Sequence, residues 1–398
     1  MLFALSGASA CTAPSGKPSP SPSPGELLLV RRSDGLAVLD TGTGRQVAGG
    51  AVVTSGPPAA ARLVTREADG RVVVRDGRTG AIVTAAAIQG DLRLAAVAPD
   101  AALVALVGGD PLGRKETTVV VAGPAGEQYR LTVPGFVEPE AFNFGGSSLF
   151  VLDMLPPEHP DRYRVRCLDL QSGRLNALNL PGENAGIKVL VPTGAEEEMR
   201  GQGRQAVFDP DRNRLFTLYS HQPDHQHVRD LLNPGARDSK PDVHAFVHTL
   251  NVADGWAVCV DLPGQFGTGP AEGLTIARSR NEVWTADAGV GSLVQIEPSA
   301  LVVNYELAFP ATPGKAALWA DVDDVLLAVG RSVRHFESPA KRLVAEWPLP
   351  GAALGVAASK QHVYVGQADG VLRLDRVTGQ VTAQLPVAGL TGVERIVG

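Results

Sequence analysis

Five of the eight histidines of the chain fall within residues 221–248. They are His221, His225, His227, His244 and His248. Neutral imidazole binds zinc and other transition metals, and carboxylates in the same stretch could complete a set of ligands. The first close pair is a His-x-His, and the even spacing of the last two places both on one face of the strand expected there. We therefore consider His225, His227, His244 and His248 as candidate metal ligands.

The spacing of these histidines matches no closed metal-binding motif, which leaves two other interpretations open. The stretch could be a polar loop that makes ordinary hydrogen bonds, or a loop that responds to pH or contacts a ligand. On the last interpretation all five histidines are candidate binding residues. The sequence contains no Gly-x-Ser-x-Gly, His-Glu-x-x-His or phosphate-loop motif, so it identifies no catalytic residue. We expect a binding module, with a metal- or histidine-dependent enzyme centred on residues 221–248 as the alternative.

Cys11 follows a short apolar segment that ends in small residues, Ala8-Ser9-Ala10. This pattern is typical of the end of a bacterial lipoprotein signal peptide, in which the cysteine is acylated. No Lys or Arg precedes the apolar segment, and Ala8 stands where Leu is usual. We expect residues 1–10 to be the remnant of a signal peptide and Cys11 to be lipidated, on the outer face of the cytoplasmic membrane. Secretion without a lipid, or a cysteine with no such role, are the alternatives.

Residues 11–25 alternate Ser and Pro and contain nothing that could form a core. Such a segment favours an extended polyproline conformation and would serve as a tether. The other two cysteines, Cys167 and Cys259, lie in predicted strands of neighbouring repeats. An exported protein permits a disulfide between them, and two reduced core cysteines are the alternative.

The composition limits the class of partner. The net charge of −6 provides no basic surface for nucleic acid. No stretch of 18 uninterrupted apolar residues occurs, so no transmembrane helix is expected and the membrane would be reached through the lipid anchor only. A protein, a glycan or another component of the cell envelope remains as the expected partner.

The architecture is clearest in residues 354–387, where four β-rich runs are separated by turn residues. Residues 362–367 and 371–375 alternate apolar and polar side chains, which is the period of a half-buried strand. A four-stranded meander cannot cover both of its faces, but copies packed around an axis can. Similar units recur about every 45 residues, so we predict an all-β, single β-propeller over residues 26–398 with eight antiparallel blades, or seven as the alternative.

The first repeat provides only three strands, at residues 26–31, 35–40 and 46–50, whereas residues 392–397 form a spare strand at the other end. We expect the spare strand to become the innermost strand of the first blade and close the ring. In a meander, the connections from strand two to three and from strand four to the next blade share one face. The long segments 156–162, 181–204, 221–244 and 264–271 all belong to this class, so we expect them to gather on one face near blades four to six. Asp321 and Asp324 fall in a turn of the other class, where local hydrogen bonds explain them better than calcium does.

Three turns share the pattern hydrophobic-Asp-x-x-(Thr/Ser)-Gly. They are residues 40–44, 169–173 and 375–379. In this respect the chain resembles the YVTN/YncE-like family of bacterial propellers, which are related in shape to WD40 and quinoprotein propellers. The resemblance covers nearly the whole chain but concerns the fold alone. The chain has only four Trp and lacks the Trp-rich blade signature of quinone-dependent dehydrogenases, so pyrroloquinoline quinone is not an expected cofactor.

Overall fold

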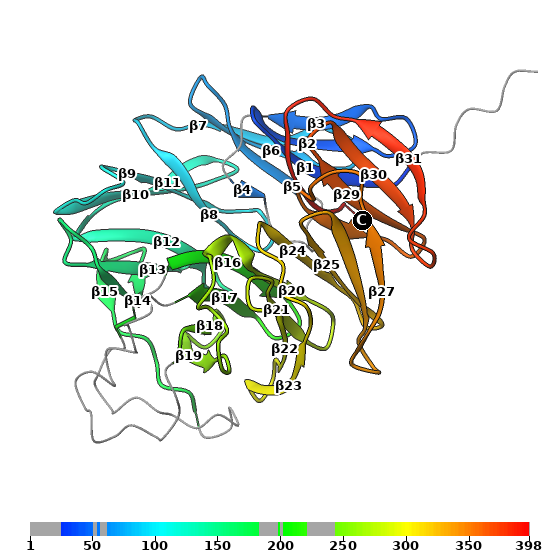
Figure 1. The fold of residues 1–398 in the computed structure, drawn as a ribbon. Coiled ribbons are helices and arrows are strands. Elements are labelled where there is room, and N and C mark those ends of the chain that lie inside the picture. Colours follow the sequence, from blue (N-terminus) through cyan, green and yellow to red (C-terminus); the bar gives the residue numbers. More distant parts are fainter. Residues whose placement is uncertain are drawn as a thin grey trace, which may run out of the picture.

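The computed structural model describes residues 25–50, 54–55, 62–182, 198–199, 202–220 and 243–397. Its strands form eight four-stranded antiparallel sheets, which stand as blades around a central axis (Figure 1). A single turn of 3-10 helix, η3 (Ala271–Gly273), is the helical element among these residues. The predicted all-β propeller with eight blades is thus confirmed, and the seven-blade alternative is wrong.

Each blade is a meander whose four strands follow one another from the axis outward. Blade 1 consists of β32 (Leu390–Ile396), β1 (Leu27–Arg32), β2 (Gly35–Asp40) and β3 (Gln46–Gly50). Blade 2 consists of β4 (Thr54–Ser55), β5 (Arg62–Arg66), β6 (Arg71–Asp76) and β7 (Ile82–Ala87). Blade 3 consists of β8 (Arg93–Val97), β9 (Val104–Gly108), β10 (Glu116–Gly123) and β11 (Gly126–Pro134). Blade 4 consists of β12 (Phe136–Phe142), β13 (Ser148–Leu155), β14 (Arg162–Asp169) and β15 (Leu175–Asn176).

The second half of the ring follows the same order. Blade 5 consists of β16 (Gln202–Asp209), β17 (Arg214–Ser220), β18 (Ala245–Asn251) and β19 (Trp256–Asp261). Blade 6 consists of β20 (Leu274–Arg278), β21 (Val283–Asp287), β22 (Ser292–Glu297) and β23 (Val302–Ala308). Blade 7 consists of β24 (Ala316–Ala320), β25 (Asp324–Val329), β26 (Ser332–Glu337) and β27 (Arg342–Pro348). Blade 8 consists of β28 (Val356–Ala358), β29 (His362–Gln367), β30 (Gly370–Asp375) and β31 (Val381–Pro386).

Burial along the strands follows their place in the blade. β25 is buried at every position after Asp324, because the neighbouring blades cover both of its faces. β31, at the rim of blade 8, alternates exposed and partly buried side chains. The core is accordingly divided among clusters of Val, Leu, Ala and Phe that lie between successive blades. Burial of apolar surface between blades is the main stabilising contribution.

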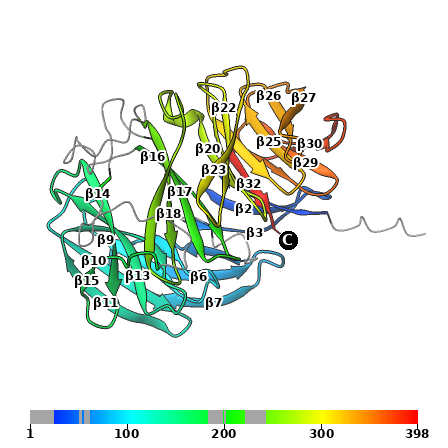
Figure 2. The same ribbon diagram turned by 90° about the horizontal axis from the view of Figure 1, so that it is seen from below.

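The ring closes through β32, the last strand of the chain. β32 pairs antiparallel with β1, with Leu28 opposite Ile396 and Val30 opposite Val393, so the first and last strands share one sheet (Figure 2). The N–H of Val397 donates to the carbonyl of Leu27 at 2.8 Å. The predicted closure is confirmed, although the strand begins two residues earlier than expected.

Blade 4 departs from the pattern expected of it. Its outermost strand, β15, is only Leu175–Asn176, whereas the outermost strands of the other blades have five residues or more. Met199, which returns from the segment after β15, forms a bridge with Tyr163 in β14, with N–H···O distances of 2.7 and 2.9 Å. An incoming segment therefore covers part of the blade edge that a longer β15 would have covered.

Polar groups link neighbouring blades at the face where strand one turns into strand two. Between blades 7 and 8, the Arg376 guanidinium lies 2.5 Å from Asp321, 2.6 Å from Asp324 and 5.0 Å from the ring centroid of Trp319. Three neighbouring seams carry comparable links, which join Arg278 to Asp209, Ser338 to Glu282, and Tyr364 to Glu26. Burial and the hydrogen bond to Glu26 raise the pKa of Tyr364 to about 12. The short turns that join strand one to two and strand three to four on this face are therefore held to the neighbouring blade by these contacts.

The expected disulfide between Cys167 and Cys259 is absent. Cys167 lies in β14, the third strand of blade 4, whereas Cys259 lies in β19, the outermost strand of blade 5. The Cys259 sulfur instead contacts the Met199 sulfur at 3.5 Å, and burial raises the pKa of the Cys167 thiol. The third and fourth strands of a blade stand at different distances from the axis of the ring, which keeps the sulfur atoms of Cys167 and Cys259 apart.

Among the described residues, no helix is long and apolar enough to span a membrane. Cys11 and the tether, residues 11–25, lie outside the described residues apart from Gly25, so lipidation stays a prediction.

Candidate binding face over blades 4 to 6

The two faces of the ring differ in what they carry. We call the face that holds the connections from strand two to three and from each blade to the next the loop face, and the opposite face the turn face. Between described strands, the three longest connections are residues 177–201, 221–244 and 262–273, and all of them lie on the loop face over blades 4 to 6, as predicted. The connection 156–161 lies on the same face, but its six residues make it no longer than connections elsewhere in the ring. Of the connecting residues, 183–197, 200–201 and 221–242 lie outside the described part of the chain.

Two of the five candidate histidines lie in the described part of the chain, and three lie outside it. His221, His225 and His227 lie outside the described residues. His244 is partly buried just before β18, and His248 is 3% exposed within β18, opposite Thr217 and Cys259. Within the described ranges, no three His, Cys, Asp or Glu side chains converge on a possible metal site. The four-histidine metal site therefore stays a prediction.

An aromatic cluster lies beneath the loop face in the seam between blades 4 and 5. The ring centroids of Tyr163 and Tyr219 are 5.3 Å apart, and Phe246 stacks on Tyr219 at 5.3 Å. Burial raises the pKa of Tyr163 well above its usual value. Met199, 2% exposed, packs in the same cluster. Aromatic pairs of this geometry add to the stabilisation from burial, so the ends of the connections 156–161 and 177–201 rest on a fixed base.

A buried carboxylate anchors the connection 262–273 between blades 5 and 6. Asp287 is fully buried, and its oxygens accept the N–H groups of Gly267 at 2.8 Å, Gly289 at 2.9 Å and Val290 at 3.2 Å. Gly267 has φ of 90°, and a Cβ there would lie 2.8 Å from the His244 carbonyl oxygen. Only glycine allows both this conformation and this approach. The anchor places the connection 262–273 directly against the residue at which the His-bearing stretch re-enters blade 5.

A buried arginine joins the loop-face connections of blades 3 and 4. Arg114 is 8% exposed, lies 4.0 Å above the Phe136 ring and donates to Glu138 at 2.9 Å. Its own N–H donates to the carbonyl of Pro157 at 2.8 Å. Glu138 also pairs with Arg93 from the innermost strand of blade 3. This network holds the connection 156–161 in place from the other side.

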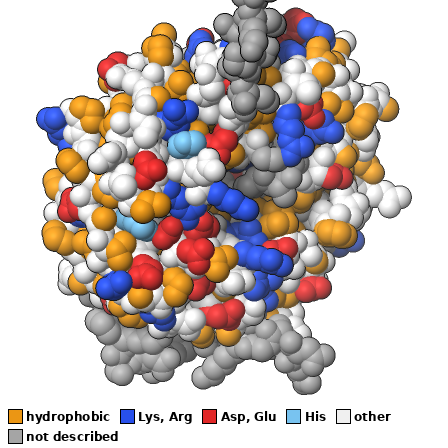
Figure 3. All heavy atoms as spheres, turned by 90° about the vertical axis from the view of Figure 1, so that its right-hand side faces the viewer, with side chains coloured by type: hydrophobic (Ala, Val, Ile, Leu, Met, Phe, Trp, Pro, Cys, Tyr) orange, Lys and Arg blue, Asp and Glu red, His pale blue; other side chains and the backbone are white. Residues whose placement is uncertain are grey.

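Surface charge does not by itself mark a binding site. In Figure 3, which views the molecule from the right-hand side of Figure 1, acidic and basic side chains lie close together among apolar ones, so that no extended patch of one sign forms on this side. The candidate face is therefore defined by its connections and their anchors.

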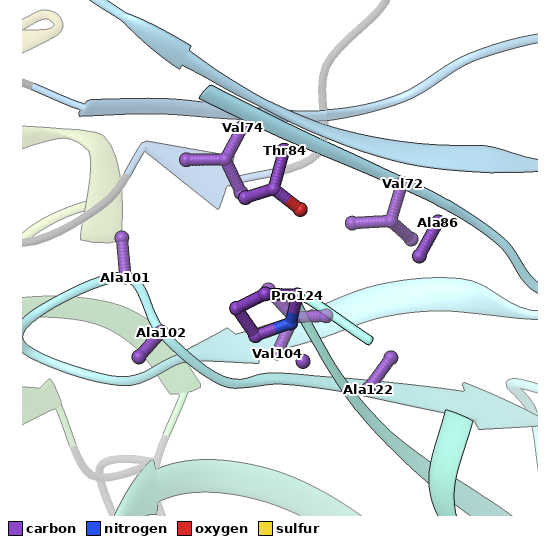
Figure 4. A pocket seen from close by; sticks show the side chains of 10 residues that line it. Val72, Val74, Thr84, Ala86, Ala101, Ala102, Val104, Ala122 and Pro124 are labelled. Carbon is purple, nitrogen blue, oxygen red and sulfur yellow. The ribbon is translucent and has the colours of Figure 1, made fainter. Parts of the chain in front are cut away.

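A small cavity between blades 2 and 3 can be set aside as a ligand site. It measures about 10 Å³ and is lined mainly by Val and Ala side chains, with Thr84 among them (Figure 4). That volume is about the least that could hold one water molecule, and the lining offers few polar partners. It is a packing gap between two apolar blade surfaces.

The importance of Tyr163, Tyr219 and Asp287 was not evident from the sequence. Each stands near a strand end, in a position typical of an ordinary core or turn residue. Their shared role depends on which blades are neighbours and on the direction in which each connection leaves. A long connection between two short repeats was the one available signal, and it indicates the region rather than the residues.

Comparison with known proteins supports the fold alone. No family model matches the chain, and no curated protein matches it. The structure of the dihydro-heme d1 dehydrogenase NirN in complex with DHE aligns over 96% of this chain and 77% of its own, with a TM-score of 0.56 and 14% identity. Apo AztD from Citrobacter koseri aligns over 92% of this chain and 96% of its own, with a TM-score of 0.53 and 12% identity. Both are bacterial β-propellers, as this chain is by its fold. Membership of the YVTN/YncE-like family stays a prediction.

Proposed function

We propose that this protein is an exported, lipid-anchored binding module that uses its loop face over blades 4 to 6 to engage a protein or another component of the cell envelope. Cys11 would carry the lipid and residues 11–25 would form the tether. The propeller would then serve as a rigid scaffold for the connections of this face, which is where binding residues are commonly carried.

One observation carries the proposal, namely the difference between the two faces. The three longest connections between described strands, residues 177–201, 221–244 and 262–273, all leave the loop face. The connections over blades 4 to 6 are held at fixed points such as Met199, Gly267 and Pro157, whose carbonyl accepts the N–H of Arg114. The turn face carries short turns linked by ion pairs and hydrogen bonds. A surface used for recognition needs variable length and chemistry on a fixed base, and the loop face alone combines these properties.

The point at which the tether meets the ring also supports the proposal. Glu26 precedes β1, which runs from the turn face to the loop face, so the chain enters the propeller from the turn face. A membrane anchor attached through this point favours an orientation in which the loop face points away from the membrane. The binding face would then be open to soluble or wall-bound partners.

The test is capture from an envelope extract with paired surface variants. Glu158 and Glu272 are exposed on the loop face over blades 4 to 6, and Val377 is 85% exposed on the turn face. Replacing Glu158 and Glu272 with Arg should abolish capture of any partner that the wild-type protein retains. The matched control Val377→Arg should leave capture intact, because it changes the opposite face.

Two results would contradict the proposal. Capture that survives the double loop-face variant but fails with Val377→Arg would place binding on the turn face. A Cys11→Ser variant should lose labelled fatty acid and leave the membrane fraction; a variant that stays in that fraction would refute the lipid anchor without bearing on the binding face.

A further inference from the structure

Blade 8 carries a pocket on the loop face that lies apart from the candidate face over blades 4 to 6. Its volume is about 280 Å³. One wall comes from the connection between blades 7 and 8 and the other from the β29–β30 turn and β31. The lining residues are Pro350, Gly351, Ala352, Leu354, Gln367, Ala368, Asp369 and Gln384.

The walls of this pocket are held by backbone hydrogen bonds. Three backbone N–H groups of the connection between blades 7 and 8 donate to backbone carbonyls of blades 7 and 8, each at 2.8 Å. These bonds run from Leu349 to Arg331, from Ala353 to Gly330 and from Leu354 to Gly366. Gln367 is 4% exposed, and its Nε2 donates to the carbonyl of Gly351 at 2.7 Å. A ligand would therefore meet a largely formed site, which lowers the conformational cost of binding.

The polar groups of the pocket are two side-chain amides and one carboxylate. Gln384 Nε2 donates to Asp369 Oδ2 at 3.0 Å, which sets the orientation of both planar groups. The lining contains no Lys, Arg or His, and the Arg331 guanidinium at the edge of the pocket donates to the carbonyl of Pro350 at 2.5 Å rather than to a lining side chain. A carboxylate without a cation in the lining disfavours an anionic ligand, because the negative charge of the ligand would be unpaired.

The remaining wall is aliphatic, with Pro350, Ala352 and Leu354. A ligand that suits the whole pocket must offer several hydroxyl groups to amide and carboxylate oxygens and also a C–H surface to the apolar wall. The volume lies at the small end of the range for ligand sites, which suits a single ring. A pyranose has this combination of properties.

We propose that this pocket binds a neutral pyranose, either as a free monosaccharide or as the terminal unit of a glycan. Asp369 and Gln384 accept and donate hydrogen bonds to neighbouring hydroxyl groups, the Gln367 amide forms the base, and the aliphatic wall packs against the ring. The site involves described residues only and does not rest on the function proposed above.

Saturation-transfer NMR on the whole propeller tests the site with D-glucose, D-galactose, D-mannose and N-acetyl-D-glucosamine, each also as its methyl glycoside. At least one neutral sugar should bind. Asp369→Asn keeps the shape of the side chain but removes its charge, and should weaken binding about tenfold, the value of one charge-assisted hydrogen bond. Ala352→Trp, which fills the opening, should abolish binding.

Asp69→Asn is the matched control. Asp69 lies in the strand-two-to-three turn of blade 2, exposed on the same face but outside the pocket, so this variant should bind as the wild type does. Equal binding of the methyl glycosides would identify a glycan terminus as the ligand, whereas loss of binding with them would identify the free sugar. The proposal is overturned if no neutral sugar binds, if glucuronate binds in preference to glucose, or if the pocket variants, folded with the wild-type melting temperature, bind unchanged.

Discussion

Removal of the closing strand should destabilise the whole ring. Truncation after Thr391 deletes most of β32 and with it Val393 and Val397, which are 6% and 9% exposed. Burial of an apolar side chain of this kind is worth about 1.5–3 kcal/mol, so the two together account for roughly 3–6 kcal/mol. The exposed ion pair between Arg31 and Glu394 adds little. The loss is therefore a large share of the roughly 5–15 kcal/mol that stabilises a typical folded domain.

An unfolding entropy of about 2.1 cal/mol/K per residue gives about 1.2 °C of melting temperature for each kcal/mol in a chain of 398 residues. The truncated protein should therefore melt roughly 4–7 °C below the wild type. Differential scanning calorimetry at one fixed scan rate measures this, since large proteins can unfold irreversibly. A variant with a shortened tether, lacking residues 12–23, is the control and should melt with the wild type. A truncated protein with an unchanged melting temperature would refute the closure of the ring through β32.

Three further predictions concern single contacts. Arg376→Leu should lower the free energy of unfolding in urea by roughly 2–3 kcal/mol, because the part-buried carboxylates of Asp321 and Asp324 lose their cation. The control Arg342→Leu removes an exposed ion pair and should cost less than about 1 kcal/mol. Equal losses in the two variants would contradict a stabilising role for Arg376 between blades 7 and 8. The pKa of Tyr364 is raised from 10.0 to about 12, so the stability contributed by its protonated hydroxyl is complete below pH 10 and is lost as the pH rises towards 12. Tyr364→Phe should therefore flatten the fall in melting temperature between pH 10 and about 12. An unchanged fall would refute this role of Tyr364. Thiol titration of the denatured, unreduced propeller without its tether should find Cys167 and Cys259 both reactive, and a result of no thiols would restore the disulfide.

The architecture was predictable because its signals are local. The strands at residues 362–367 and 371–375 and the Asp-x-x-Thr-Gly turn at 375–379 each form through contacts between residues close in the sequence, and Asp375 Oδ1 accepts the N–H of Thr378 at 2.8 Å. The half-buried alternation expected of residues 362–367 is wrong, because the neighbouring blades bury β29 at every position after His362. The missing fourth strand at one end and the spare strand at the other then required closure. Counting strands was sufficient for this step, and no distant side-chain contact had to be known.

Side-chain contacts between neighbouring blades could not be predicted from the sequence. Asp321 and Asp324 were expected as turn residues, and Asp321 does accept the N–H groups of Asp323 and Asp324. Their pairing with Arg376, more than 50 residues away, depends on the rotation of one blade against the next. The same limit explains the failed disulfide and the short β15, whose edge Met199 covers. Alternation along a strand shows which face is buried but not which partner buries it.

The direct test of the binding face is site-specific photo-cross-linking in intact cells. A photoreactive amino acid is placed either at Glu272, which lies in the connection 262–273 on the loop face, or at Val377 on the turn face. We predict a discrete cross-linked product from position 272 and none from position 377. A product from position 377 alone, or no product from position 272, would contradict the assignment of the loop face as the binding surface.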